Sequence, residues 1–406
     1  MAFIRRKSAQ LSGMIRSDLK NDRDFTLFLF VGVFTGIAGG IYSTTFNNFL
    51  NDVFKLSADA RGIVEFPREF PGMTIMFVLA LFSFLGDVKM AMLGMLFAAL
   101  GLLGLGTLSH TFSGALAWIM IFSLGTHMFF PLTPSIGMHL SAKEQYGARL
   151  GRYNAYNLVA ALMGYAIVWC GFRYLGLTYS LAFIIASVFY VLAAVVLGRM
   201  KPIKPKKFKL KFILRKRYTL FYILSLVNGA RKQIFLTFAP WVLIQVFHLT
   251  PPLFALLGVF IAAVSIMTRT IVGNAIDRLG ERFVLSAEAI LLVVICFGYA
   301  FAENIAPAGI AVIILSVCYI IDNSLNAVEM ARSTYVRKIV HNPEDVTSVL
   351  AAGTSFDHII AMTIPFLGGL LWISFGYKAV FLSAACIGLL NLFLSTKIRI
   401  NMPSKE

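Results

Sequence analysis

Long apolar segments recur along the whole chain and constrain its fold more than any other feature. Each holds about 20 to 30 residues, enough to cross a hydrocarbon core at ~1.5 Å per helical residue. With 58% hydrophobic and 14% charged residues, the chain has too few polar side chains to cover soluble domains. The sequence therefore predicts an all-α polytopic membrane protein of about twelve transmembrane helices. We place the segments at 25–50, 60–85, 88–109, 114–139, 150–173, 177–198, 218–247, 252–275, 283–303, 306–335, 347–373 and 376–396.

The formal net charge of +17 is concentrated in connections between these segments. The most basic connection, Lys201 to Arg217, holds nine Lys or Arg and no acid. If the spans alternate in direction, it shares one side with the basic N-terminus, while the opposite connections at 109–114 and 248–252 carry no Lys or Arg. The positive-inside rule predicts that both termini and this linker are cytoplasmic. We expect a plasma (inner) membrane protein without a cleaved signal peptide, whose linker contacts anionic lipid headgroups and no nucleic acid.

The two halves of the chain repeat each other. Sliding the chain by 193 residues aligns 24–57 with 217–250, and Gly36 then matches Gly229. This similarity predicts two pseudo-symmetric six-helix bundles joined by the basic linker. The expected parts are a cytoplasmic N-terminal segment 1–24, a first bundle 25–200, a cytoplasmic linker 201–217, a second bundle 218–396 and a cytoplasmic tail 397–406.

The connection between the eighth and ninth segments reads GNAIDRLGER, residues 273–282. It resembles the cytoplasmic loop motif G-x-x-x-D-R-x-G-x-R of the major facilitator superfamily, and the two six-helix halves extend the resemblance to essentially the whole chain. The resemblance implies a transporter that works by alternating access, with this loop as a latch of the cytoplasmic gate. Without that role, the loop is a solvated turn with positive-inside charges. The implied gate residues are Gly273, Asp277, Arg278, Gly280, Arg282 and, in the weaker first-half copy LFSFLGDVKM, Asp87.

The seventh segment carries three polar residues, Arg231, Lys232 and Gln233, where the aligned first segment reads Ala-Gly-Gly. A charge inside the membrane costs roughly 2.5–3.5 kcal/mol on insertion scales, so it needs a partner or a task. Neighbouring helical residues point ~100° apart, so the two cations face different surroundings. Either both neutralise buried carboxylates, or at least one binds an anionic solute, which is the alternative we favour.

The second segment places Glu65, Arg68 and Glu69 on one helical face. This face forms a cation site, a proton relay or an internal ion-pair network. We expect Pro67 and Pro71 to kink or loosen the same end of the helix.

The tenth segment carries a polar stripe of Asp322, Asn326 and Glu329, which Arg332 continues. In the family that it resembles, this segment lines a central cavity, so the stripe is expected to face water or solute. Arg332 belongs either to the stripe or to the cytoplasmic gate.

Two further segments contain histidine. His127 of the fourth is either a hydrogen-bonded core residue or a proton carrier. The eleventh places Asp357 beside His358, and a carboxylate in a low-dielectric surrounding can carry a proton. Asp357 either does so or neutralises Arg231 or Lys232. Its repeat mate at a slide of 200 residues is Asn157, which has no charge.

These residues make up the predicted site. The substrate-binding candidates are Arg231, Lys232, Gln233, Asp322, Asn326, Tyr42, His127 and Asn157. The coupling candidates are Asp357, His358, Glu329, Glu65 and Glu69.

The sequence contains no zinc, nucleophile-elbow, kinase or nucleotide-binding motif, so we expect neither an enzyme nor a cofactor. We expect a monomeric secondary active transporter in the lipid bilayer that moves a small organic or inorganic anion. Its driving force is a proton or sodium gradient, with protons favoured, or the solute's own gradient in a uniporter. The alternatives are efflux of a cationic or amphipathic compound and a non-transporting membrane sensor with the same fold.

Overall fold

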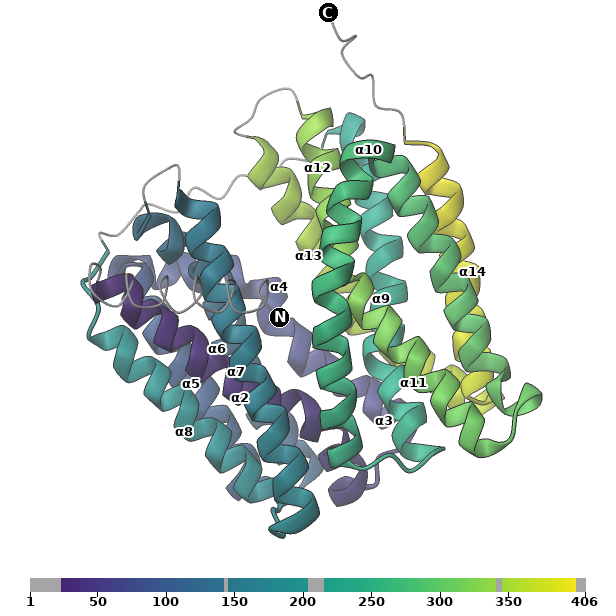
Figure 1. Ribbon diagram of the computed structural model, residues 1–406, viewed down its shortest axis with the longest axis horizontal. Coiled ribbons are helices and arrows are strands. Elements are labelled where there is room, and N and C mark those ends of the chain that lie inside the picture. The colour runs from purple at the N-terminus through teal and green to yellow at the C-terminus, as the bar shows by residue number, and fades with distance from the viewer. Residues whose placement is uncertain (1–22, 142–144, 204–214, 341–344, 399–406) are drawn as a thin grey trace, which may run out of the picture. The chain divides into compact units, whose positions relative to one another are not determined.

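The computed structural model describes residues 23–141, 145–203, 215–340 and 345–398. These residues are helical almost throughout, which confirms the all-α membrane fold class (Figure 1). The expected N-terminal segment, the middle of the basic linker and the tail lie mostly outside the described residues. The helices are α2 (Arg23–Phe54), α3 (Ala58–Ile63), α4 (Glu65–Leu81), α5 (Asp87–Thr107), α6 (Phe112–His139), α7 (Tyr146–Tyr174), α8 (Tyr179–Gly198), α9 (Thr219–Gln245), α10 (Pro251–Ile305), α11 (Ala308–Ser324), α12 (Glu329–Ile339), α13 (Asp345–Phe375) and α14 (Tyr377–Thr396).

Four expected spans depart from a single straight helix. The second divides into α3 and α4, and Pro67 lies in the first turn of α4, where a missing N–H is tolerated. The eighth and ninth join as α10, which is interrupted by a non-helical Gly280. The tenth is broken by a 3₁₀ turn, η4 (Leu325–Val328), between α11 and α12.

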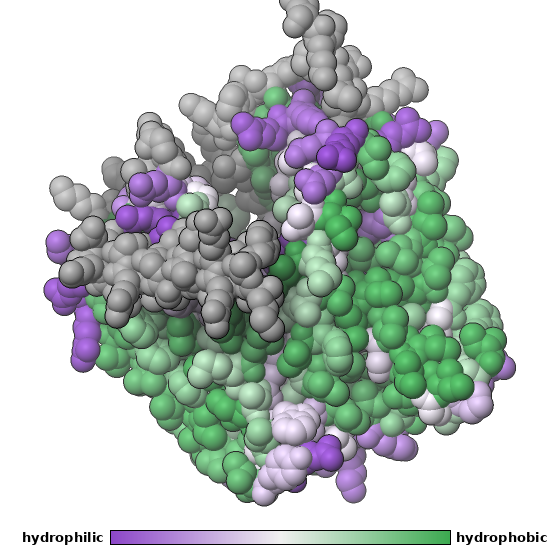
Figure 2. Space-filling model, in the orientation of Figure 1, coloured by the Kyte–Doolittle hydropathy of each residue, from purple (hydrophilic) through white to green (hydrophobic). Residues whose placement is uncertain are grey.

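Side chains on the lipid-facing surface support membrane insertion. Among the described residues, nine helices are long and apolar enough to cross a membrane, and α10 counts once among them although it covers two expected spans. Helices α4 and α9 are not among the nine, so the count of twelve stays a prediction there. Figure 2 shows hydrophobic side chains spread over the outer face of α10, which exposes large residues such as Phe260, Ile271 and Phe297.

The described residues group by contact into two compact units. The first contains residues 23–43 and 74–203, and the second contains 44–73 and 215–398. Residues 44–54 at the end of α2, all of α3 and the start of α4 therefore pack with helices from the C-terminal half. The expected domains divide the chain by sequence position at the basic linker, whereas these units are defined by contacts. The expected boundaries therefore remain a prediction.

In the first unit, α5 packs against both α6 and α8. Small residues permit this approach: a Cβ on Gly125 of α6 would lie 2.3 Å from the backbone nitrogen of Ala98 in α5. In the second unit, α10 packs against α11 and α14, and α9 packs against α13 and α14. An aromatic and aliphatic cluster at the start of α9 includes Tyr218, Phe221 and Tyr222.

Candidate functional site

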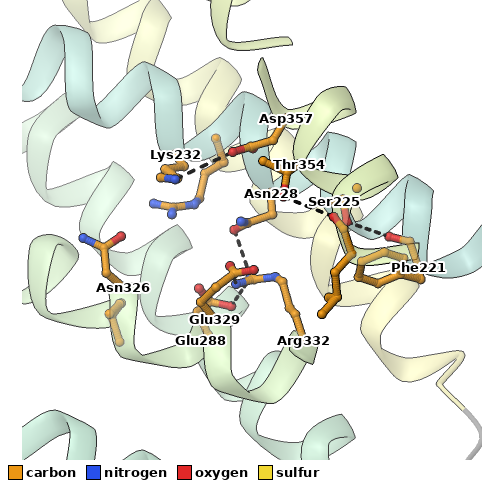
Figure 3. A pocket seen from close by; sticks show the side chains of 14 residues that line it. Phe221, Ser225, Asn228, Lys232, Glu288, Asn326, Glu329, Arg332, Thr354 and Asp357 are labelled. Atoms are coloured by element: carbon orange, nitrogen blue, oxygen red, sulfur yellow. Dashed lines mark hydrogen bonds and ion pairs between the residues drawn. The ribbon is translucent and has the colours of Figure 1, made fainter. Parts of the chain in front are cut away.

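A cavity of about 460 Å³ lies within the second unit (Figure 3). Helices α9, α10, α12 and α13 and the 3₁₀ turn η4 contribute its walls. The volume lies in the range of small-molecule pockets, about 300–1,000 Å³. Among the described residues, six charged ones line the cavity: Arg231, Lys232, Glu288, Glu329, Arg332 and Asp357.

Arg231 forms a buried ion pair with Asp322 across α9 and α11. Its Nη1 donates to Asp322 Oδ1 at 2.6 Å, and both side chains are less than 10% exposed. Its Nε is buried and has no hydrogen-bond partner among the described residues. The guanidinium also lies 5.7 Å from the ring centroid of Phe235. Thus Asp322, expected to bind solute, neutralises Arg231 in this structure.

Lys232 points to a different partner. Its Nζ lies 3.7 Å from Asp357 Oδ2, longer than a normal hydrogen bond, and the two side chains are 39% and 29% exposed (Figure 3). The two adjacent cations of α9 therefore meet acids on two different helices, as their ~100° separation predicts. The Lys232–Asp357 pair is the looser and more accessible of the two.

Arg332 of α12 holds together a third group of polar side chains. Its Nη2 donates to Glu288 of α10 at 2.6 Å and to Asn228 of α9 at 2.9 Å. Its Nη1 donates to Glu329 at 3.2 Å. The Arg332 and Glu288 side chains are 7% and 2% exposed, whereas that of Glu329 is 64% exposed.

Glu288 and Asn228 were not among the sequence candidates. The signal for Glu288 was a single acid in the apolar run AEAILLVV, and Asn228 belongs to the NGARKQIF stretch that carries the two cations. Their roles depend on Arg332, for which the sequence is compatible with both the polar stripe and the gate.

The η4 turn places part of the tenth-span stripe at the cavity wall. Leu325 and Asn326 belong to the turn, and Glu329 begins the helix that follows it. Asn326 Nδ2 donates to the backbone oxygen of Asn323 at 2.9 Å. A 3₁₀ interruption inside a span often marks a functional position, because it changes the direction of side chains along one helix.

A separate buried polar network, distinct from the three charged groups at the cavity, connects α3, α4 and α9. Arg61 Nη1 donates to Glu65 at 2.6 Å, both side chains are fully buried, and Gln233 Nε2 donates to the other Glu65 oxygen at 2.8 Å. Arg61 also donates to Asn47 of α2. Arg68 lies 3.0 Å from Glu65. Of the alternatives for this face, the internal ion-pair network matches these contacts.

The same network extends toward the cavity through Glu69. Arg68 Nε lies 3.6 Å from Glu69, and Glu69 Oε2 lies 2.9 Å from His358 Nδ1 in α13. His358 follows Asp357, the partner of Lys232. All five coupling candidates, Glu65, Glu69, Glu329, Asp357 and His358, belong to the second unit.

The other substrate-binding candidates lie in the first unit. Tyr42 contacts the ring of Phe122, with centroids 4.4 Å apart. His127 Nδ1 lies 2.9 Å from the backbone oxygen of Ser123. Asn157 Nδ2 donates to the backbone oxygen of Gly32 at 2.9 Å, a contact that ties α7 to α2.

The loop motif inside α10 is built around a glycine turn. Gly280 has φ 81°, a left-handed conformation that favours glycine, and Glu281 behind it is buried with Lys338 of α12 at 2.7 Å. The other charged motif residues, Asp277, Arg278 and Arg282, are exposed and form no ion pair or hydrogen bond with another described residue. Gly273 lies inside the helix.

The first-half copy of the motif has the same turn at Gly86, with φ 75° before α5. The next residue, Asp87, is buried and accepts a hydrogen bond from Ser135 of α6. Asp87 is therefore the counterpart of Glu281 and not of Asp277, which lies four residues before Glu281. Residue spacing alone could not show which positions of the two motif copies correspond, because the positive-φ glycine defines the match.

Comparison with known families decides the identity of the fold. The model of the Major Facilitator Superfamily matches residues 70–334, well over half of the chain. The chain belongs to the major facilitator superfamily. The resemblance carried by GNAIDRLGER is thus confirmed.

Solved structures of major facilitator transporters have the same fold. A bacterial homologue of the human lysosomal transporter Spinster, in an inward-facing and occupied conformation, shares 15% identity at a TM-score of 0.70, over 91% of this chain and 95% of that one. The nucleoside transporter NupG shares 12% at 0.68, over 92% and 99%. The xylose transporter XylE from E. coli shares 14% at 0.67, over 94% and 97%. No curated protein matches the chain in sequence.

Proposed function

We propose that this member of the major facilitator superfamily is a proton-coupled secondary active transporter for a small solute with an anionic group, working by alternating access. One observation carries the proposal: a cavity of about 460 Å³ presents a half-exposed Lys232 that is only loosely paired with Asp357. An ammonium group in this position can exchange its internal carboxylate for that of a solute.

The exchange couples solute binding to a proton. While Asp357 is ionised, it competes with an anionic solute for Lys232, because one ammonium at 3.7 Å from a carboxylate is already partly neutralised. When Asp357 takes up a proton, this competition ends and Lys232 is available for the solute. The proton and the anionic group therefore enter the site together.

The neighbouring residues have supporting roles in this scheme. Glu69 and His358, 2.9 Å apart, provide a second pair that can hold a proton next to Asp357. Glu65 is fully buried between Arg61 and Gln233, so we assign it to stabilising the helices and not to coupling. Glu281, together with the motif loop, contributes to the cytoplasmic gate through Lys338.

The test uses the purified full-length protein in proteoliposomes, with uptake of candidate anions measured with and without an inward proton gradient. Asp357→Asn should abolish stimulation by the gradient while solute counterflow continues, because counterflow needs no net proton movement. Lys232→Met should lose both activities. The matched control is Lys378→Met, since Lys378 is similarly exposed, at 38%, but lies outside the cavity.

Two results would contradict the proposal. If gradient-driven uptake survives Asp357→Asn, this carboxylate does not couple the proton. If Lys232→Met transports anions as well as Lys378→Met does, the anion does not bind at Lys232.

The exposed Glu329 supports a second candidate, export of a cationic or amphipathic compound. In that case organic cations, and not anions, would be transported, and Glu329→Gln would stop their transport. A protein that binds ligand but shows no flux in either direction would be the non-transporting sensor.

A further inference from the structure

The charges around the cavity define the solute more narrowly than its anionic group does. From their balance we infer that the solute is a small zwitterion, with a carboxylate that binds at Lys232 and an ammonium that binds at Glu329. This inference rests on the proposed transport function.

The buried charges of the cavity are already compensated inside the protein. Arg231 is paired with Asp322 at 2.6 Å, and Arg332 with Glu288 at 2.6 Å, with all four side chains less than 10% exposed. Such pairs are costly to break, because each would leave an unpaired charge in a low-dielectric surrounding. A solute therefore meets the remaining charges.

Among the described residues that line the cavity, three accessible charged groups remain: Lys232, Asp357 and Glu329. Glu329 is the most accessible, with its side chain 64% exposed and a single contact to an Arg332 that also binds Glu288 and Asn228. In Figure 3, Lys232 and Asp357 lie on one side of the cavity and Glu329 and Arg332 on the other. The cavity thus offers an accessible cation and an accessible anion at separate positions.

The sum of these charges selects among solutes. Counting the buried pairs as neutral leaves two carboxylates against one ammonium, and protonation of Asp357 leaves one of each. The adjacent network is also balanced, since Arg61 and Arg68 face Glu65 and Glu69. A neutral zwitterion preserves this balance, whereas a simple anion or a simple cation leaves one uncompensated charge inside the membrane.

The uncharged walls suit the body of such a solute. Phe221, Leu325 and Leu350 supply apolar surface, while Ser225 and Thr354 supply hydroxyl groups. An amino acid with an aliphatic or aromatic side chain has this combination of two opposite charges and an apolar part.

The experiment compares three matched triples, in each of which the acid lacks the ammonium group of the amino acid and the amine lacks its carboxylate. They are alanine, propionate and ethylamine; leucine, isocaproate and isoamylamine; and phenylalanine, hydrocinnamate and phenethylamine. Binding to the full-length protein is measured by thermal unfolding, and transport by counterflow in proteoliposomes of phosphatidylethanolamine and phosphatidylglycerol. In at least one triple, the amino acid should bind at least about tenfold more tightly than the acid or the amine.

Two variants test which residue binds the ammonium of the solute and which binds its carboxylate. Glu329→Gln should remove the preference for the amino acid over the acid, because the acid then leaves no uncompensated charge in the cavity. Lys232→Met should instead remove the preference for the amino acid over the amine. The matched control Glu303→Gln alters an acid of α10 outside the cavity and should keep both preferences.

The other outcomes overturn the inference in distinguishable ways. If the acid of a triple binds as tightly as the amino acid, the zwitterion is wrong and the anion transporter stands. If the amine binds as tightly, both are wrong. If no member of the triples binds, the inference fails, and uptake of inorganic phosphate and citrate decides the proposed function separately.

Discussion

At the scale of single residues, the second unit contains cations that differ in how completely nearby carboxylates neutralise them. Arg231 and Arg332 each have a carboxylate at 2.6 Å in a buried position, while the ammonium of Lys232 is 3.7 Å from its acid and half exposed. The planar guanidinium suits permanent buried pairs, because its several donors can bind more than one acceptor. The single ammonium suits an exchangeable contact.

Glu288→Gln should therefore destabilise the protein strongly. The change leaves the buried Arg332 without its closest carboxylate, and breaking a buried pair costs about 3–5 kcal/mol. Thermal unfolding in detergent measures the loss, with the exposed Glu303→Gln as the control. An unchanged unfolding temperature for Glu288→Gln would show that Arg332 does not depend on this pair.

At the scale of elements, the turns at Gly86 and Gly280 are the clearest structural sign of the internal repeat. Each glycine has a positive φ, and each precedes a buried acid that contacts the last turns of another helix of its own unit: Asp87 bonds to Ser135 and Glu281 to Lys338. The backbone conformation and the acid after it are retained in both halves, although the rest of the motif is not.

Two alanine substitutions in the same motif should have opposite effects. At Gly280, φ 81° places a Cβ in the left-handed region and should cost about 1–2 kcal/mol. Gly273 lies inside the helix with no atom within 4 Å of an added Cβ, so alanine there should stabilise by about 0.5–1 kcal/mol. Thermal unfolding compares the two variants. Equal changes would mean that the turn at Gly280 does not constrain the helix pair.

At the scale of the whole molecule, the predicted orientation places the motif loop of 273–282 in the cytoplasm and the connection at 109–114 outside. The family and the apolar helix surfaces establish a membrane protein but leave the direction of insertion to this rule.

Cysteine labelling in intact cells tests this orientation. In a variant whose four native cysteines are replaced, Ser109→Cys should react with a membrane-impermeant maleimide, and Arg278→Cys should react only after the cells are permeabilised. Labelling of Arg278→Cys in intact cells, with Ser109→Cys protected, would show the reverse orientation.

The sequence by itself determined the membrane class, the positions of the helical segments and the polar residues inside them. Hydrophobic length and charge bias are local properties, readable over one segment at a time. The helical period likewise predicted that Arg231 and Lys232 would face different surroundings.

Only the tertiary structure decided which groups meet. Asp322, 91 residues from Arg231, became its partner, and Glu65 of α4 met Gln233 of α9 across 168 residues. Such pairings depend on the rotation and packing of each helix, and one turn of shift selects a different partner. The same applies to Glu288 and to the packing of residues 44–73 with the C-terminal helices, because no local pattern encodes a contact between segments far apart in the chain.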